Sequence, residues 1–402
     1  MTARPSPAPP ARPLPLGALL ALAMAGFITI LTEALPAGLL PQMAAGMHVA
    51  PTWLGQLITA YALGSMLAAI PLATATQGMR RRPLLMAAIA GFAVANTVTA
   101  CSSSYTLTLV ARLIAGISAG LLWALIAGYA ARMVPHEQQG RAIAVAMVGT
   151  PLALSLGVPA GTLLGNILGW RLCFGLISVL TLVLMAWVRL GLPDFAGLPG
   201  GKRQTIRQVF SLPGVRSVLF VVLTFVLAHN ILYTYIAPFL ATAHLAEHTE
   251  WVLLVFGVTS VLSIWVVGAL IDRHLRRLTL VSTLLFALAA LLIGLAGTQP
   301  VAVYAAVACW GLAFGGAATL FQTALAKAAG DAMDVAQAML VTAWNLAIAG
   351  GGIVGGVLLD RFGTTTFAPA VLMLLLATFW VVWSARRGGF PVAVVHVTGA
   401  LP

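Results

Sequence analysis

The chain has 402 residues, of which 61% are hydrophobic and 7% are charged, and its formal net charge is +12. Soluble domains carry about 25% charged residues, so this composition excludes a soluble globular protein. The positive net charge alone would suit a nucleic-acid partner, but the positions of the basic residues, described below, argue against one.

Apolar runs of about 18–25 residues recur along the whole chain, each long enough to cross the hydrocarbon core of a bilayer as an α-helix. They are too long and continuous for the short alternating strands of a membrane β-barrel. We therefore expect an all-α membrane protein with twelve transmembrane helices, at residues 14–40, 53–76, 84–101, 105–131, 142–165, 172–190, 216–240, 251–271, 278–296, 301–326, 335–358 and 367–385.

The first run has some features of a secretory signal peptide, because a basic flank precedes an apolar stretch with Ala-Leu-Ala. The apolar stretch continues to Leu31, however, which is beyond the length of a signal core. Its removal would leave eleven helices and spoil the internal repeat described below. We therefore expect it to be the first membrane helix.

Most of the basic residues fall on one side of the membrane in this twelve-helix topology. With the N-terminus in the cytoplasm, 18 of the 21 Lys and Arg residues fall in cytoplasmic loops and tails. Arg171 and Arg361 fall in outer loops, and Arg112 lies inside a span. This is the positive-inside bias, so the net charge reports membrane topology. We expect a multi-pass protein of the plasma (inner) membrane with both termini in the cytoplasm.

The sequence repeats weakly when it is shifted by 195 residues against itself. The matches fall at equivalent places in the two halves, and they are Gly116 with Gly311, Gly120 with Gly315, Gly157 with Gly352, Gly161 with Gly356, Arg81 with Arg276 and Arg82 with Arg277. Two parallel six-helix repeats are the plan of one large class of transporters, whose substrate site lies between the halves near the middle of the membrane.

The repeat divides the chain into two pseudo-symmetric six-helix bundles and three polar segments. We expect the N-terminal bundle at 14–190 and the C-terminal bundle at 216–385. Residues 191–215 are basic and rich in Gly and Pro, which predicts a flexible cytoplasmic linker that lets the halves rock. Residues 1–13 and 386–402 are predicted to be cytoplasmic tails without a core.

Glu33 is the one acid among nine that lies within a predicted span. An ionisable group in hydrocarbon costs several kcal/mol unless protein or water shelters it. Ala21, Ala25, Thr29 and Glu33 share one small, polar helix face, which we expect to point inward. A position in the headgroup layer remains an alternative, since Glu33 lies about 28 Å along the helix from Leu14.

Arg112 lies about 10 Å into the fourth span from the outside. A buried arginine usually has a partner, which can be Glu33 or backbone carbonyl groups. His229 is the one histidine within a span, and an imidazole titrates near neutral pH. It is therefore a second candidate for carrying a proton, although a buried histidine that is merely hydrogen-bonded fits equally well.

The remaining polar and aromatic residues of the predicted spans suit a neutral polyol or a planar solute. These candidate substrate-cavity residues are Trp123, Asn230, Tyr233, Tyr235, Gln322, Gln337 and Asn345. Cys101, Cys173 and Cys309 have no CxxC spacing, so we expect no metal site, and a disulfide between Cys101 and Cys173 is left open. The chain has no Gly-rich nucleotide-binding loop, and we expect no cofactor.

Several motifs resemble those of the major facilitator superfamily, within its twelve-span drug:proton antiporter branch. "GALIDRHLRR" at 268–277 resembles the signature loop between the second and third helices of a half, and "ATATQGMRRR" at 73–82 is its degraded copy, with Gln77 in place of the acid. "RLIAG" at 112–116 and "GVPAG" at 157–161 resemble the arginine and antiporter motifs of spans 4 and 5.

A closer resemblance is to bacterial sugar efflux transporters. It covers essentially the whole chain and is carried by "TEALPAGLLP" (32–41), "AHNILYTYIAPF" (228–239) and "DVAQAMLVTAWNLAIAGGG" (334–352). The chain departs from those proteins at Ala119, in the region of span 4 where they tend to have a histidine.

The resemblance implies a proton-coupled exporter of small neutral or amphiphilic solutes, such as sugars or drug-like compounds. It implies proton coupling at Glu33 and Arg112, to which His229 is added from its own chemistry, and the signature loop predicts gating at Asp272, Arg273 and Arg276. Asp272 would attract positive charge or a helix N-terminus across the bundle, whereas the arginines alone would also satisfy the positive-inside rule. The expected partners are a small-molecule substrate, protons and the bilayer, with no nucleic acid, and the expected state is a monomer.

Two other functions remain open at this point. An uptake symporter of the same fold is one, because sequence does not fix the direction of transport. A polytopic membrane enzyme is the other, but it would need paired acids or a nucleophile cluster at the membrane face. The predicted cytoplasmic acids, Glu137, Asp194, Asp272, Asp331 and Asp334, are scattered along the sequence, so we expect no enzyme.

The predicted topology can be tested by cysteine labelling in intact cells. Single cysteines at Thr52 and Gln299 should react with an impermeant reagent added outside, and a cysteine at Ser211 should not, because the first two lie in outer loops and the third in the linker. Labelling at position 211 would overturn the topology.

Overall fold

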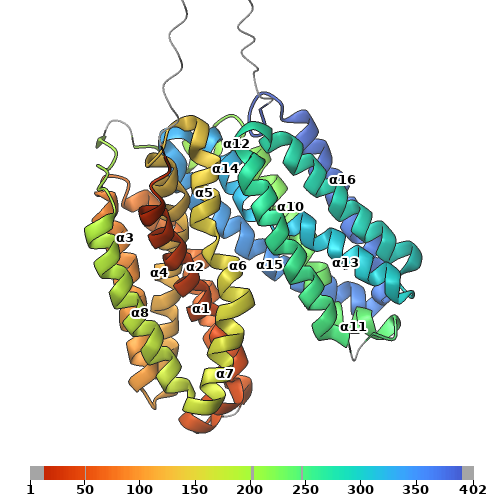
Figure 1. Ribbon diagram of the computed structural model, residues 1–402, viewed down its shortest axis with the longest axis horizontal. Coiled ribbons are helices and arrows are strands. Elements are labelled where there is room, and N and C mark those ends of the chain that lie inside the picture. Colours follow the sequence, from red (N-terminus) through yellow and green to blue (C-terminus); the bar gives the residue numbers. More distant parts are fainter. Residues whose placement is uncertain (1–12, 50, 201–202, 246–247, 392–402) are drawn as a thin grey trace, which may run out of the picture.

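The computed structural model describes residues 13–391 except residues 50, 201–202 and 246–247, and this part of the chain is helical (Figure 1). Its α-helices are α1 (Leu16–Met47), α2 (Pro51–Ala75), α3 (Arg81–Cys101), α4 (Tyr105–Arg132), α5 (Gln139–Met147), α6 (Gly149–Leu152), α7 (Val158–Leu168), α8 (Trp170–Gly191), α9 (Ile206–Phe210), α10 (Val215–Thr234), α11 (Ile236–Thr242), α12 (Thr249–Ala296), α13 (Pro300–Phe314), α14 (Ala317–Ala329), α15 (Met333–Phe362) and α16 (Phe367–Ser384).

Ten stretches of the described helices are long and apolar enough to cross a membrane. Two of them are much longer than one crossing. The stretch Trp251–Ala296 has 46 residues and non-helical backbone at His274, and the stretch Pro300–Phe362 has 63 residues and takes in α13, α14 and α15. Each covers two predicted spans, so the ten stretches accommodate the twelve spans that the sequence predicts.

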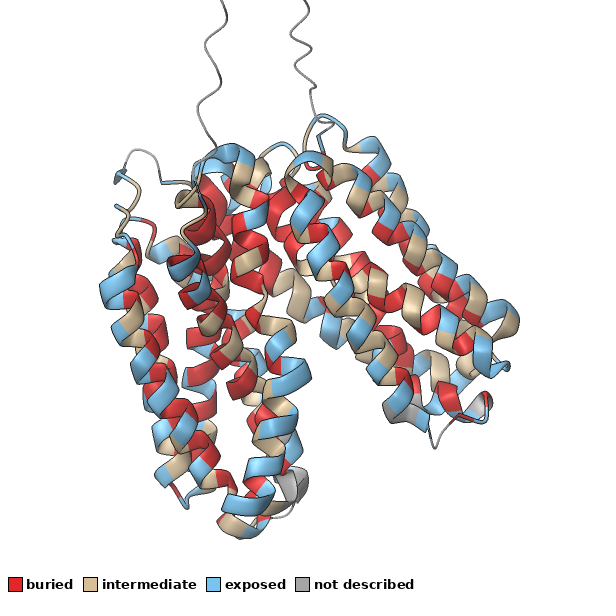
Figure 2. Ribbon diagram, in the orientation of Figure 1, coloured by how far each residue is buried: buried red, intermediate tan, exposed pale blue. Residues whose placement is uncertain are grey.

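The helices form two bundles, α1 to α8 and α10 to α16, which meet at one end and diverge toward the other (Figure 1). Across the contact, α15 packs on α2 and α4, and α5 packs on α12 and α14. The loops that carry most of the predicted cytoplasmic Lys and Arg lie at the end where the bundles meet, which we call the basic end. Buried residues gather there and inside each bundle (Figure 2).

Four of the repeated glycines make the same contacts in the two bundles. Gly116 leaves no room for a Cβ against the Tyr61 carbonyl, and Gly120 leaves none against the Ser65 carbonyl. In the second bundle, Gly311 and Gly315 lie in the same way against the carbonyls of Phe256 and Ser260, each 195 residues further along. Small residues let two helix backbones approach this closely, so the repeat in the sequence reflects a repeated packing contact.

The linker is attached to the first bundle, which corrects the expectation of a flexible tether for its first part. Asp194 accepts hydrogen bonds from Arg80 Nε at 2.6 Å and from the Arg82 N–H at 3.1 Å. The Gln77 side chain accepts from the Gln204 N–H and donates to the Gln204 carbonyl, both at 3.0 Å. The residue that replaces the acid of the signature loop thus holds the linker backbone.

The first residues of the predicted C-terminal tail also pack against the bundle. Phe390 is fully buried, and the backbone of residues 388–389 lies so close to Gly214 that a Cβ there would not fit. Gly214 has a φ of 90°, in the left-handed region that favours glycine. The C-terminal bundle therefore extends about five residues beyond its predicted end.

The attachment of the linker should depend on pH through Asp194. Burial raises the pKa of this carboxyl group, but the Arg82 N–H, the Arg80 side chain and the charges of both arginines lower it, and the net pKa lies below the ordinary 3.8. Because the pKa of Asp194 is lowered in the attached linker, the ionised carboxylate stabilises the attachment at pH values above the ordinary pKa. This stabilisation is lost as the pH falls through the lowered pKa. Hydrogen-exchange protection of the Leu198 amide, which donates to the Gln77 carbonyl, should therefore fall below about pH 4, after correction for intrinsic exchange. Asp194→Asn should show low protection throughout, and a wild-type pH dependence in this variant would contradict the interpretation.

Candidate functional site

A buried carboxylate joins the two bundles at the basic end. Asp334, in the first turn of α15, accepts two hydrogen bonds from Arg132 at 2.9 and 3.0 Å and forms an ion pair with Arg81 at 2.8 Å. The side chains of Arg81 and Asp334 are only 2% and 4% exposed. Both arginines belong to the first bundle and Asp334 to the second, so this bidentate, charge-assisted group holds the bundles together.

A second acid of the second bundle also contacts the first bundle. Asp272 of α12 accepts hydrogen bonds from the backbone N–H groups of Gly140 at 2.7 Å and Arg141 at 3.3 Å, at the N-terminal end of α5. A carboxylate there satisfies free N–H groups and interacts favourably with the helix dipole. Gly140 and Gly128 have no room for a Cβ beside Asp272 and Asp334, respectively, so a glycine of the first bundle accommodates each acid.

A layer of small apolar side chains adjoins these polar contacts. Ala69 and Ala73 of α2, Ala124 of α4, and Ala338 and Val341 of α15 form one buried cluster, against which Trp123 packs. We call these five residues the apolar layer. Because it comes from both bundles, it closes the gap between them with side chains that exclude water. The bundles diverge at the opposite end (Figure 1), so the molecule is closed at its basic end.

The other two predicted gating residues differ from Asp272 and from each other. Arg276 donates to the carbonyls of Val382 and Trp383, at 2.6 and 2.9 Å, at the C-terminal end of α16. It satisfies free carbonyl groups there and ties α12 to α16 within the second bundle. Arg273 is exposed. Of the three residues, Asp272 is the one whose described contacts cross between the bundles.

Arg112 is buried inside the first bundle, where it binds backbone carbonyl groups. It donates from Nη1 to the Thr32 carbonyl, from Nη2 to the Glu33 carbonyl at 3.4 Å and from Nε to the Leu57 carbonyl at 3.3 Å. Its guanidinium carbon also lies 4.8 Å from the centroid of the Tyr61 ring, a cation–π distance. The ion pairs found within 4.0 Å among the described residues do not include Glu33 with Arg112.

The proline in "LTEALP" explains why Arg112 lies there. In an α-helix the N–H of residue 36 would donate to the carbonyl of residue 32, but Pro36 has no N–H. The Thr32 carbonyl therefore lacks the donor that an α-helix normally supplies four residues on, and Arg112 donates to it from α4. An unsatisfied carbonyl is costly in hydrocarbon, so the arginine and the proline form one structural unit.

The Glu33 carboxylate lies at the edge of this unit. Its side chain is half-buried, and the charge of Arg112 and the hydroxyl of Tyr61 act on it. Ala21, Ala25 and Thr29, on the same helix face, are almost fully buried. The small, polar face thus packs inside the first bundle, and Glu33 is its most accessible member. A carboxylate near a cation, yet not paired with it, can exchange a proton without breaking a salt bridge.

His229 lies in an aromatic cluster of the second bundle. Its Nδ1 accepts a hydrogen bond from Trp310 Nε1 at 3.1 Å, and its ring stacks on Phe314 at a centroid distance of 3.5 Å and on Tyr233 at 5.1 Å. An indole N–H can only donate, so this Nδ1 carries no proton. Protonation there would break the hydrogen bond and place a charge among aromatic rings. The geometry therefore favours a neutral histidine that is held in place by the indole and the stacked rings. The part of His229 in proton coupling stays a prediction.

Most of the predicted substrate-cavity residues have partners within the second bundle. Asn230 and Asn345 donate to the carbonyls four residues before them, Tyr235 donates to the Gly352 carbonyl at 2.7 Å, and Gln337 donates to the Gln322 carbonyl at 2.9 Å. Tyr233 is 45% exposed, and Trp123 is half-buried beside the apolar layer. The structure thus brings His229 and Tyr233 together, and Gln322 with Gln337. A common substrate cavity for the whole set stays a prediction.

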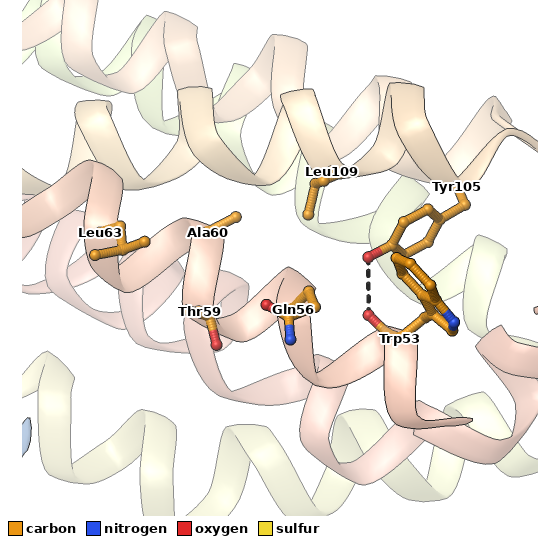
Figure 3. Close-up of a pocket in the computed structure, with 7 residues that line it drawn as sticks. All are labelled: Trp53, Gln56, Thr59, Ala60, Leu63, Tyr105 and Leu109. Atoms are coloured by element: carbon orange, nitrogen blue, oxygen red, sulfur yellow. Dashed lines mark hydrogen bonds between the residues drawn. The ribbon is translucent and has the colours of Figure 1, made fainter. Parts of the chain in front are cut away.

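A groove lies between α2 and α4 (Figure 3). It has a volume of about 550 Å³ and is lined by Trp53, Gln56, Thr59, Ala60, Leu63, Tyr105 and Leu109. The Tyr105 hydroxyl donates to the Trp53 carbonyl at 2.9 Å, and the lining is mainly apolar. Such a groove between membrane helices suits hydrocarbon better than a polar solute.

Cys101, Cys173 and Cys309 are free, so the disulfide left open by the sequence is not formed.

The family model of the Major Facilitator Superfamily matches residues 22–352 and 236–395. The chain belongs to the major facilitator superfamily.

Curated relatives and a solved structure agree with this assignment. The chain is 29% identical over 376 residues to OpdE of Pseudomonas aeruginosa, which is described as a transcription regulatory protein. The aligned region covers 92% of this chain and 93% of OpdE. It is 28% identical over 388 residues to a probable sugar efflux transporter of Mannheimia succiniciproducens, covering 94% and 96% of the two chains. The proton:xylose symporter XylE superposes with a TM-score of 0.73 at 13% identity, covering 92% of this chain and 95% of that one, and this likeness shows the fold alone.

As a member of this superfamily, the protein is a multi-pass membrane transporter for small molecules and not an enzyme. Three residues at these contacts were not among the predicted site residues, namely Asp334 and Arg132 between the bundles and Tyr61 beside Arg112, and Arg81 was named only in the repeat and in the loop motif. Asp334 looked like a loop acid, because no local pattern tells which distant arginines it will contact. The signal that the sequence offers is its position directly before an apolar run, where an acid favours a helix start.

Removal of the Asp334 charge should open the basic end. Asp334→Asn leaves the buried Arg81 and the half-buried Arg132 without their anion, and breaking a buried ion pair in this way typically costs about 3–5 kcal/mol. A cysteine placed at Ala338, which is fully buried in the apolar layer, should then react with a maleimide more than tenfold faster than in the wild-type background, with the natural cysteines replaced.

Asp331→Asn is the matched control, because Asp331 is exposed three residues earlier. Equal labelling rates in the Asp334→Asn and Asp331→Asn proteins would show that the ion group does not keep the basic end closed.

Proposed function

We propose that this transporter exports small neutral or amphiphilic solutes, sugars first among them, in exchange for protons. The observation that carries the proposal is the half-buried Glu33 carboxylate, which lies within reach of Arg112 and Tyr61 without an ion pair. A coupling group must hold a proton in one conformation and release it in another, and a carboxylate whose burial and neighbours change with conformation does this.

The closed basic end supports a cycle of alternating access. With the positive-inside topology, the state described here faces outward, so Glu33 would take up a proton from the outer side as substrate leaves. Opening of the basic end requires that Asp334 leave Arg81 and Arg132, and that Asp272 leave the N-terminus of α5. Both contacts lie between the bundles, so they can break while each bundle moves as a rigid body.

The substrate class rests on the relatives and on the chemistry of the second bundle. The name of the relative from Mannheimia succiniciproducens indicates sugar efflux. Among the described residues of this chain, the aromatic cluster around His229 and the amide pair Gln322 with Gln337 contain no acid, which fits a neutral solute better than a cation. Gln322 Oε1 is buried without a hydrogen-bond partner among the described residues, so a donor on the substrate could satisfy it.

The proposal is tested by transport in liposomes with an imposed pH gradient. We expect labelled D-xylose or another member of a panel of neutral sugars, nucleosides and amphenicols to accumulate on the side from which protons leave. Glu33→Gln should abolish accumulation driven by the gradient while it preserves exchange of substrate down its own gradient, because the amide imitates the protonated acid.

Glu137→Gln is the control, since Glu137 is an exposed acid at the basic end. Accumulation on the side that protons enter would establish uptake by symport in place of export. Proton-driven accumulation that persists in Glu33→Gln would move the coupling group elsewhere.

A further inference from the structure

Tyr61 is the fully buried tyrosine of α2 that lies between the two charged groups of the first bundle. Its ring faces the Arg112 guanidinium at 4.8 Å. Its hydroxyl lies 3.3 Å from the Thr29 carbonyl oxygen and also interacts with the Glu33 carboxylate. A phenol has a single proton to donate, so the hydroxyl can serve the carbonyl or the carboxylate, but not both at once.

The internal repeat supplies a natural comparison for Tyr61. The residue 195 positions further along is Phe256, and both residues offer their backbone carbonyl to a close-packed glycine, Gly116 and Gly311. The counterparts of Glu33 and Arg112 at the same shift are Ala228 and Val307, both buried. Where the charges are absent the hydroxyl is absent too, although the aromatic ring and the helix contact remain. Packing at this position therefore needs only the ring.

We propose that Tyr61 is the positioning residue of the proton site, with its ring holding Arg112 on the Thr32 carbonyl that Pro36 leaves free and its hydroxyl stabilising the ionised Glu33 carboxylate. This inference rests on the proposed function, because it assumes that Glu33 exchanges the coupled proton. The cation–π contact and the three carbonyl acceptors keep the guanidinium away from the carboxylate, so that the phenol, rather than a salt bridge, supplies the donor to the ionised acid.

The two groups that act electrostatically on the Glu33 carboxylate are Arg112 from α4 and Tyr61 from α2. The other helices packed on α1 contribute their charged side chains elsewhere. Arg141 of α5 lies at Asp272, and Arg171 of α8 donates to the Gly46 carbonyl at the far end of α1. The polar group that α3 brings to this region is Asn96, which donates to the Thr32 hydroxyl at 3.0 Å and carries no charge. Removing the Tyr61 hydroxyl should therefore affect the Glu33 carboxylate while leaving Arg112, its cationic neighbour, in place.

The experiment follows the protonation of Glu33 directly and needs no substrate. Purified full-length protein in lipid nanodiscs is titrated by infrared difference spectroscopy, and the carboxyl band of Glu33 is identified by its absence in Glu33→Gln. In Tyr61→Phe the aromatic ring stays, but the ionised Glu33 carboxylate loses its hydroxyl donor. The midpoint of the Glu33 band should therefore move to higher pH by roughly 0.5–1 unit. Replacing Tyr61 by 3-fluorotyrosine strengthens the donor at nearly the same size, so the midpoint should move the opposite way.

Tyr105→Phe is the matched control, because it also removes a hydroxyl that donates to a carbonyl of α2, at Trp53, away from the charged groups. Its midpoint should equal that of the wild type. Coincident midpoints for the wild type, Tyr61→Phe and the fluorotyrosine protein would overturn the role of Tyr61 and leave the proposed function standing. Absence of any titrating Glu33 band in the wild-type protein would instead refute Glu33 as the coupling group. If Tyr61→Phe does not fold, the fluorotyrosine protein alone decides, with an unmoved midpoint counting against the proposal.

Discussion

The ion group at Asp334 is the interaction on which the arrangement of the two bundles depends. One carboxylate from α15 meets two arginines of the first bundle, and the carboxylate and Arg81 are almost completely buried. Burying three charges is favourable only with close, hydrogen-bonded geometry, and it becomes costly as soon as one member leaves. The same group therefore makes the closed arrangement of the basic end well defined.

The two contacts at the basic end use opposite arrangements of charge. In the second half, the signature-loop acid Asp272 reaches the N-terminus of α5. In the first half the loop has Gln77 at that place, and the acid instead lies in the first turn of the opposing helix, where the loop arginine Arg81 reaches it. Gln77, freed from gating, binds the linker backbone. The degraded motif thus has a different structural role, and in this half the loop arginine, rather than a loop acid, makes the contact between the bundles.

The interiors of the two bundles have also diverged from a shared packing frame. The close-packed glycines of α4 and α13 make equivalent contacts with α2 and α12, so the backbone frame is common. On that frame the first bundle carries Glu33, Tyr61 and Arg112, and the second carries His229, Phe256 and Trp310 in an aromatic cluster. The first bundle thus has a charged interior and the second an aromatic, uncharged one, and the proposed division of proton exchange and solute contact between the halves rests on this difference.

The sequence by itself determined the membrane helices, the two-fold repeat and the sidedness of the basic loops, because hydrophobic length and charge distribution are properties of short segments. It also singled out Glu33, Arg112 and Asp272, since a charge inside or beside an apolar run is conspicuous without any structure. Only the tertiary structure decided the partners of these charges. Arg112 binds the carbonyl left free by Pro36, Asp334 joins three helices that are up to about 250 residues apart in the sequence, and the linker is attached to the first bundle. These contacts depend on which helix faces meet and on a few ångströms of space left by single glycines, and no local sequence pattern encodes distances between segments so far apart.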